Sequence, residues 1–104
     1  MEEVELRVSE RTHMYVSVDV AKGRDVDFGM MLVQPGVDGA DDPPAPSRLF
    51  GPCHRATNLS ANVLVPHAGT VVLGFDNSGS WVREKRVHFR VRLGDGSGRG
   101  ATLL

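Results

Sequence analysis

Residues 69–93 have the sequence GTVVLGFDNSGSWVREKRVHFRVRL, in which two runs carry apolar residues at every second position. The apolar members of these runs are Val71, Leu73, Phe75, Val87, Phe89, Val91 and Leu93. Because successive side chains of an extended chain point to opposite faces, this spacing predicts two β-strands with one buried face each. The polar segment between them, rich in Asp, Asn, Ser and Gly, predicts a tight connection.

Four more runs with the same period lie upstream, at residues 4–8, 14–20, 26–33 and 59–65. No window shows a helical period over three turns, and the strand former Val dominates the apolar residues. Six strands with one apolar face each favour two antiparallel sheets packed face to face. We therefore predict an all-β, single-domain antiparallel β-sandwich that is jelly-roll-like, with a small barrel as the alternative.

The length of 104 residues suits a chain with one hydrophobic core. The sandwich is expected over residues 1–93, with a long exposed loop at residues 36–47, where Gly, Pro and Asp are frequent. Residues 94–104 have the sequence GDGSGRGATLL, and their glycine content predicts a flexible tail.

Charge and cysteine content argue against several classes of protein. Twelve Lys and Arg residues against thirteen Asp and Glu residues give a net charge of -1, so the chain lacks the positive field that draws proteins onto nucleic acids. Cys53 is the single cysteine, which excludes an internal disulfide and favours a reducing, cytoplasmic compartment. No stretch is long and apolar enough to predict a transmembrane segment.

No catalytic residue is predicted. Ser78 and Ser80 lie near Asp76, but no nucleophile-elbow motif surrounds them, and a triad also needs a histidine base. Cys53 and His54 are neighbours in the sequence, and neighbouring residues of a strand point to opposite faces. We expect both groups to be structural or incidental.

The four histidines lack the short paired spacing of a zinc site, so neither a metal nor a cofactor is predicted. Six aspartates fall at or near predicted loops, namely Asp25, Asp27, Asp38, Asp41, Asp42 and Asp76. Because calcium prefers carboxylate ligands, a calcium- or lipid-dependent membrane-targeting sandwich is one alternative function. A small ligand-binding or hydrolase β-barrel is another.

The segment around Trp81 predicts a structural corner instead of a catalytic loop. Phe75 ends the preceding run on its apolar face. Asp76, Asn77 and Ser78 can bond nearby backbone amides, which suits a tight connection. Trp81, the only tryptophan, has a large apolar body to bury, and its indole N–H can meet a carbonyl at the rim of the sandwich.

The same segment resembles the C-terminal signature of the GOLD (Golgi dynamics) domain family. In that signature a strand ending in Phe-Asp-Asn-Ser leads through Ser-Trp and a basic pair into the last strand. The matching residues are Gly69, Leu73, Phe75, Asp76, Asn77, Ser78, Ser80, Trp81, Arg83, Lys85, Val87, Phe89 and Val91. Residues 25–32, DVDFGMML, are similar to an early strand of the family, so the likeness covers residues 12–93.

The resemblance implies a non-catalytic module that recruits other proteins in membrane trafficking. This chain shows neither the disulfide nor the transmembrane helix of the family's membrane-spanning cargo receptors, so it resembles the cytosolic branch. In that branch, GOLD domains sit beside lipid-binding or acyl-CoA-binding domains. The expected partners are trafficking or Golgi-associated proteins, and the expected place is cytoplasmic, peripheral to Golgi or endosomal membranes.

A basic stripe near the last predicted strand is the candidate partner- or lipid-binding surface. It comprises Arg83, Lys85, Arg86, His88, Arg90 and Arg92. The last four alternate with apolar residues and are expected to point away from the core. One interpretation is a solvated face whose charges pair with acidic neighbours such as Glu5 or Asp19. The other is contact with an acidic protein segment or with anionic phospholipid headgroups.

A sheet edge offers a second route to a partner, because an extended peptide can add to an unpaired strand. The sequence does not tell which strand forms such an edge, and it leaves the oligomeric state open.

Overall fold

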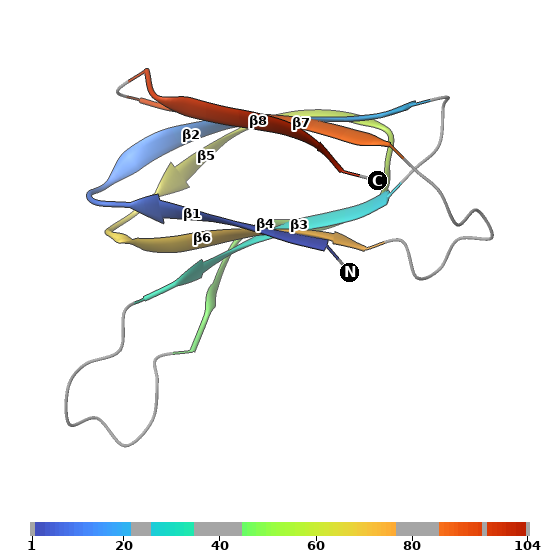
Figure 1. Cartoon of the computed structure of the whole chain (residues 1–104). Helices are drawn as coiled ribbons and strands as arrows, with labels where there is room; N and C mark the ends of the chain where they lie inside the picture. Colours follow the sequence, from blue (N-terminus) through green and yellow to red (C-terminus); the bar gives the residue numbers. More distant parts are fainter. Residues whose placement is uncertain (1, 22–25, 35–44, 77–85, 95, 104) are drawn as a thin grey trace.

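The structure is a computed structural model that describes residues 2–21, 26–34, 45–76, 86–94 and 96–103. The strands, shown in Figure 1, are β1 (Glu2–Val8), β2 (Thr12–Val20), β3 (Val26–Val33), β4 (Ser47–Ala56), β5 (Asn58–Val65), β6 (Gly69–Asp76), β7 (Val87–Leu93) and β8 (Gly98–Leu103). They pair antiparallel in two four-stranded sheets. We call the sheet with the order β1-β6-β3-β4 sheet 1, and the sheet with the order β5-β2-β7-β8 sheet 2.

The two sheets lie face to face as the layers of a sandwich (Figure 1). The prediction of an all-β, single-domain, jelly-roll-like antiparallel sandwich is therefore confirmed as two packed antiparallel sheets. The barrel alternative is wrong, because the described strands form two separate sheets that end in the edge strands β1, β4, β5 and β8. A barrel would have to close each sheet on itself.

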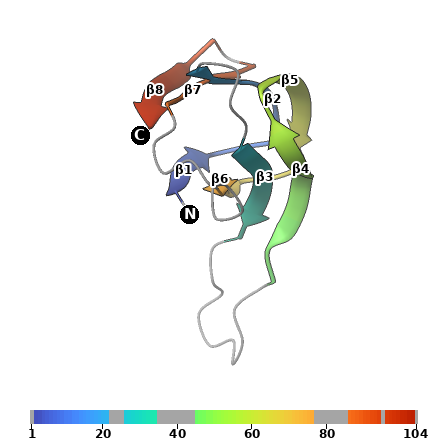
Figure 2. The same cartoon turned by 90° about the vertical axis from the view of Figure 1, so that its right-hand side faces the viewer.

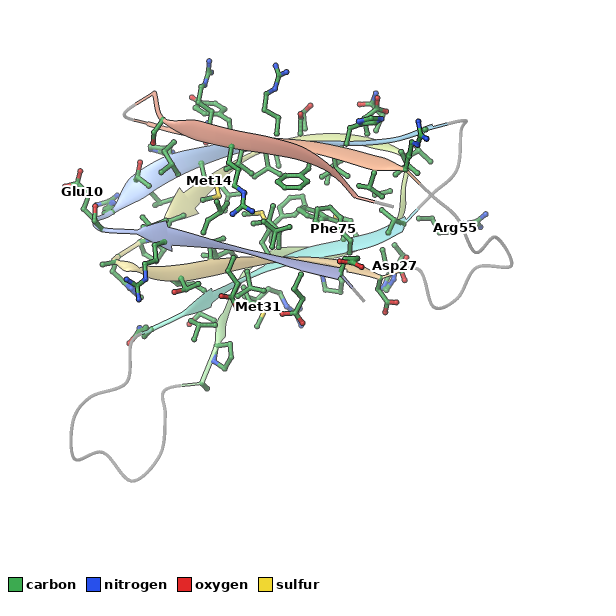
Figure 3. The ribbon with its side chains drawn as sticks, viewed as in Figure 1. Glu10, Met14, Asp27, Met31, Arg55 and Phe75 are labelled. Carbon is green, nitrogen blue, oxygen red and sulfur yellow. The ribbon has the colours of Figure 1, made fainter. Side chains whose placement is uncertain are left out.

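Side chains from alternate positions of both sheets fill the space between the layers. The buried hydrophobic residues are Val4, Val8, Met14, Val16, Val18, Val20, Val26, Phe28, Met30, Leu32, Val63, Val65, Val71, Leu73, Phe75, Val87, Phe89 and Val91. Figure 3 shows Met14 of sheet 2 and Phe75 of sheet 1 between the ribbons. The Phe75 ring lies 5.1 Å from the Phe28 ring and 5.8 Å from the Phe89 ring of sheet 2, measured between centroids. Phe75 therefore connects the two layers.

The segment that carries the predicted corner connects the two sheets, because β6 belongs to sheet 1 and β7 to sheet 2. Phe75 is buried in the core and Asp76, at the end of β6, is half-buried. Asn77, Ser78 and Trp81 lie outside the described residues, so the role of the corner itself stays a prediction.

The structure adds β4 to the strands that the sequence predicts. It begins at Ser47, the last residue of the predicted loop 36–47, and most of that loop lies outside the described residues. The pairing of β4 with β3 shifts register three times, so the strand lacks a regular period. Gly51 has a φ of +76° and Arg55 a φ of +58°, which are left-handed values at irregular points of the strand.

The prediction of a flexible tail over residues 94–104 is wrong for residues 98–103, which form β8 against β7. Glycine lowers the intrinsic preference for a strand, but the edge of β7 supplies a ladder of hydrogen-bonding groups. Gly98 also permits a close approach, because a Cβ there would lie 2.6 Å from the backbone oxygen of Val91. The glycine content that predicted flexibility thus allows the strand to fit.

The two long sides of the sandwich differ in how they are closed (Figure 2). On one side, β4 continues through Thr57 into β5, so the chain itself joins sheet 1 to sheet 2. On the other side, β1 and β8 form the edges of different sheets. There Arg99 Nη1 donates a hydrogen bond to the backbone oxygen of Glu5 at 3.3 Å. A cationic side chain thus spans the side that the backbone does not close.

Candidate functional site

The part of the predicted basic stripe that the structure describes lies on one exposed face. His88, Arg90 and Arg92 alternate along β7 with buried residues of the core, and all three are exposed. Arg86 precedes β7 and is also exposed, and its backbone oxygen accepts a hydrogen bond from the amide of Ala21 at 2.9 Å. Arg83 and Lys85 lie outside the described residues.

The strand β2 pairs with β7 beside the stripe. The residues of β2 therefore determine whether an opposite charge faces each basic side chain. Asp19 lies opposite His88, Ser17 opposite Arg90 and Tyr15 opposite Arg92. On the other flank, Arg90 faces Gly100 and Arg92 faces Gly98. The strands next to Arg90 and Arg92 therefore place no carboxylate directly opposite either of them.

The register permits the expected charge pairing for one acidic residue and not for the other. Asp19 has the position beside His88 that such pairing requires. Glu5 does not, because it lies on β1 in sheet 1. Neither Arg90 nor Arg92 makes a salt bridge with a residue in the described part of the chain. Their charges remain available to a partner.

A groove of about 430 Å³ lies over this face of sheet 2. The side chains that line it and bear on its chemistry are Tyr15, Ser17, Ser60, Asn62, Arg90 and Arg92. Tyr15 is 44% exposed, and the Arg92 guanidinium carbon lies 5.1 Å from the centre of its ring, within the range of a cation–π contact. We call these residues the basic groove.

The basic groove presents hydrogen-bond donors suited to anionic oxygen atoms. Two guanidinium groups can each bind a carboxylate or phosphate with paired N–H donors, and the hydroxyl and amide groups beside them add further donors. The Tyr15 ring supplies an apolar surface that restricts the position of Arg92. The groove can therefore bind an anion.

Sequence reasoning found the arginines of this surface and missed Tyr15, Ser60 and Asn62. The alternation along residues 87–93 was enough to show that the basic side chains point outward. The other residues come from β2 and β5, and only the strand order brings them beside β7. In the sequence, the one sign of these residues is that each is polar or aromatic at an outward position of a predicted strand.

The described residues that were considered for catalysis and metal binding do not line the basic groove. His54 Nδ1 lies 3.5 Å from Asp27 Oδ2, and the His54 side chain is 74% exposed. Cys53 is half-buried, and Ser78 and Ser80 lie outside the described residues. Within the described ranges, no group of three or more His, Cys, Asp or Glu side chains is placed to hold a metal ion. Of the calcium candidates, Asp27 and Asp76 are described.

Asp27 is held in its charged form by its surroundings. The backbone amide of Arg55 donates a hydrogen bond to Asp27 Oδ1 at 2.9 Å. This bond is the main reason that the pKa of Asp27 lies below its usual value, and His54 adds to the effect while Asp76 opposes it.

The described residues include no helix long and apolar enough to cross a membrane. Comparison with models of protein families, with curated proteins and with solved structures finds no match to this chain. The likeness to the GOLD domain therefore stays a prediction from the residues of the sequence.

Proposed function

We propose that this chain is a non-catalytic recruitment module that binds an acidic segment of a partner protein through the basic groove of sheet 2. The observation that carries the proposal is the pair Arg90 and Arg92, exposed and opposite no carboxylate, beside an exposed Tyr15. Interfaces are enriched in tyrosine and arginine, and such side chains supply much of the binding energy.

A solvated surface would show a different pattern. Solvated sheet faces commonly place opposite charges on neighbouring strands, because such pairs add a few tenths of a kcal/mol to about 1 kcal/mol of stability. Here the register places serine, tyrosine and glycine next to the two arginines. The protein forgoes that stabilisation at Arg90 and Arg92, which supports a role in binding.

The resemblance of residues 69–93 to the GOLD signature gives the proposal its cellular setting. We place the partner among trafficking or Golgi-associated proteins, and the module on the cytoplasmic side of Golgi or endosomal membranes. The compartment agrees with the single Cys53, which is a free thiol. Anionic phospholipid headgroups share the chemistry of an acidic peptide, and the experiment below separates the two.

Fluorescence anisotropy with a labelled nine-residue peptide of alternating glutamate and glycine tests the proposal. We expect saturable binding that weakens at least tenfold between 20 mM and 200 mM NaCl, because screening weakens contacts between exposed charges. The variant R90E/R92E should lose binding. The matched control R7E/R11E makes the same change in net charge and should retain it, since Arg7 and Arg11 lie outside the groove.

Two further measurements set the limits of the proposal. Circular dichroism and thermal unfolding of R90E/R92E should match those of the unchanged protein, because both side chains are exposed. Sedimentation with phosphatidylcholine vesicles that contain phosphatidylserine tests the lipid source. Binding to these vesicles without binding to the peptide would replace the protein partner by a membrane surface. Equal peptide binding by both charge-reversed variants would reject the basic groove.

A further inference from the structure

The outer face of sheet 1 has a chemistry opposite to that of the basic groove. Met31 and Val33 of β3 and Val72 of β6 occupy outward positions there, and all three are half-buried. Figure 3 shows Met31 on the side of sheet 1 that faces away from sheet 2. The outward face of a sandwich sheet is usually polar, so an apolar centre on this face calls for a cover.

A groove of about 470 Å³ lies over this apolar centre. Its floor comes from β3 and β6, and Phe50 and Pro52 of β4 contribute to its wall. We call it the sheet 1 groove. Like the basic groove, it is formed by described residues of two or more neighbouring strands.

Two glycines lie side by side in the floor of the sheet 1 groove. Gly29 of β3 pairs with Gly74 of β6. Nothing in the backbone demands glycine at position 29, where a Cβ would meet the Phe50 oxygen and the Pro52 Cα at an ordinary contact distance of 3.7 Å. A larger residue would fit this strand and favour it. The effect of the glycine is to leave space above the sheet.

One end of the groove is acidic. Asp27 and Asp76 lie directly opposite each other, and Glu3 lies opposite Gly74. All three acidic residues line the groove, and so do Arg48 and His54, of which His54 contacts Asp27. Three carboxylates against one arginine and one histidine leave the lining net negative, whether His54 is neutral or charged. Charge complementarity therefore favours a basic occupant.

The spacing of these features defines the shape of the occupant. Asp27 precedes Met31 by four residues on β3, which corresponds to about 13 Å along an extended strand. An extended peptide has the same rise per residue, and its positions i and i+4 point to the same side. When an apolar side chain of the peptide lies over Gly29 and Met31, another side chain of the peptide can therefore reach the carboxylates. That second side chain lies within four residues of the first, on either side of it in the sequence.

We propose that the sheet 1 groove is a second docking site, which binds an extended protein segment that carries an apolar anchor and a Lys or Arg within four residues of it. The apolar anchor fills the space above Gly29 and Gly74, and the cation lies between Asp27 and Asp76. The site is on the face opposite the basic groove and holds a partner of opposite charge, so it goes beyond the proposed function. The two sites together would connect two partners.

An NMR titration with a nine-residue peptide tests this site directly. The peptide has leucine at its third and fifth positions, lysine at its seventh and ninth, and serine or glycine elsewhere. We expect saturable shifts of the amides of Gly29, Met31 and Gly74, with those of Ser17 and Arg90 unchanged. A peptide with glutamate in place of both lysines should bind at least about tenfold more weakly, since two charge contacts become repulsive.

Two variants of the protein make the test specific. G29V fills the floor with a residue that the backbone tolerates and should weaken binding at least about fivefold while the chain stays folded. D27N/D76N removes two charges, keeps the acceptor for the Arg55 amide, and should weaken binding about threefold to tenfold. Should G29V fail to fold, M31K tests the same groove at a half-buried outward position.

The matched control is R90E/R92E, which should bind this peptide as the unchanged protein does. Wild-type affinity in both G29V and M31K would reject the site, and so would peptide shifts confined to other strands. Shifts of the Gly29, Met31 and Gly74 amides on concentrating the protein alone would show that a second copy of the chain occupies the groove, which also overturns the proposal. Loss of acidic-peptide binding alone would reject the proposed function and leave this site intact.

Discussion

The two outer faces of the sandwich differ far more than the two inner faces do. Inward positions of both sheets hold Val, Leu, Met and Phe, which pack in one core. Outward positions of β2 and β7 hold exposed residues such as Tyr15 and Arg90, whereas those of β3 and β6 hold half-buried residues such as Met31 and Val72. The inner faces therefore specify the fold, and the outer faces carry the two proposed binding surfaces.

The largest difference between the two sheets is expected from a substitution that strains the backbone of sheet 1. At Gly51 in β4, φ is +76°, and a Cβ there would lie 2.8 Å from the Phe28 backbone oxygen. G51A combines backbone strain with a clash and should lower the free energy of unfolding by about 2–4 kcal/mol in urea denaturation. The sheet 1 groove should lose its wall and its peptide affinity.

A glycine on sheet 2 provides the control for that change. Gly96, between β7 and β8, has a φ of +91° but has open space where a Cβ would be placed. G96A should therefore cost only the strain of a left-handed residue, about 1–2 kcal/mol. Equal losses in G51A and G96A would show that close packing against β3 contributes nothing.

A smaller effect should appear within the basic groove. Tyr15 and Arg92 are expected to stabilise each other by about 0.5–1 kcal/mol, the usual range of an exposed cation–π contact. A double-mutant cycle of Y15L and R92Q, followed by urea denaturation, measures this coupling. The same cycle with R7Q in place of R92Q should give no coupling, because Arg7 lies on sheet 1.

The smallest effect concerns the acidic end of sheet 1. Because the folded state lowers the pKa of Asp27, its carboxylate adds stability above the unfolded pKa, and this stability is lost as the pH falls through the lower pKa of the folded state. D27N should flatten that part of the pH profile. Urea midpoints measured from pH 6 to pH 2 check this, and an unchanged slope below pH 4 would contradict it.

The period of two was sufficient to predict six of the strands and the core that they share. It failed for β4, where glycine, proline and register shifts interrupt the alternation around Gly51 and Pro52. It failed for β8 because glycines at 98 and 100 resemble a linker until an edge strand is present to pair with them. Both strands form because a neighbouring strand pairs with them, and their own composition does not show that pairing.

Prediction of the two proposed binding surfaces was limited by strand order. The arginines of β7 were found, since alternation alone shows where they point. Tyr15, Asn62 and the whole sheet 1 groove were missed, because they arise where strands distant in the chain meet. Asp27 and Asp76 illustrate this: in the sequence they are two of six aspartates at or near predicted loops, and only the β3–β6 register sets them opposite each other.

The order of the strands also has a consequence for how the chain acquires its structure. β1 pairs with β6, and β2 pairs with both β5 and β7, so several ladders join segments far apart in the sequence. Topologies of this kind fold slowly, on the order of milliseconds to seconds, because long loops must close before contacts form. During synthesis, β1 and β2 expose their apolar faces until β6 and β7 leave the ribosome, which makes that interval the one most open to aggregation.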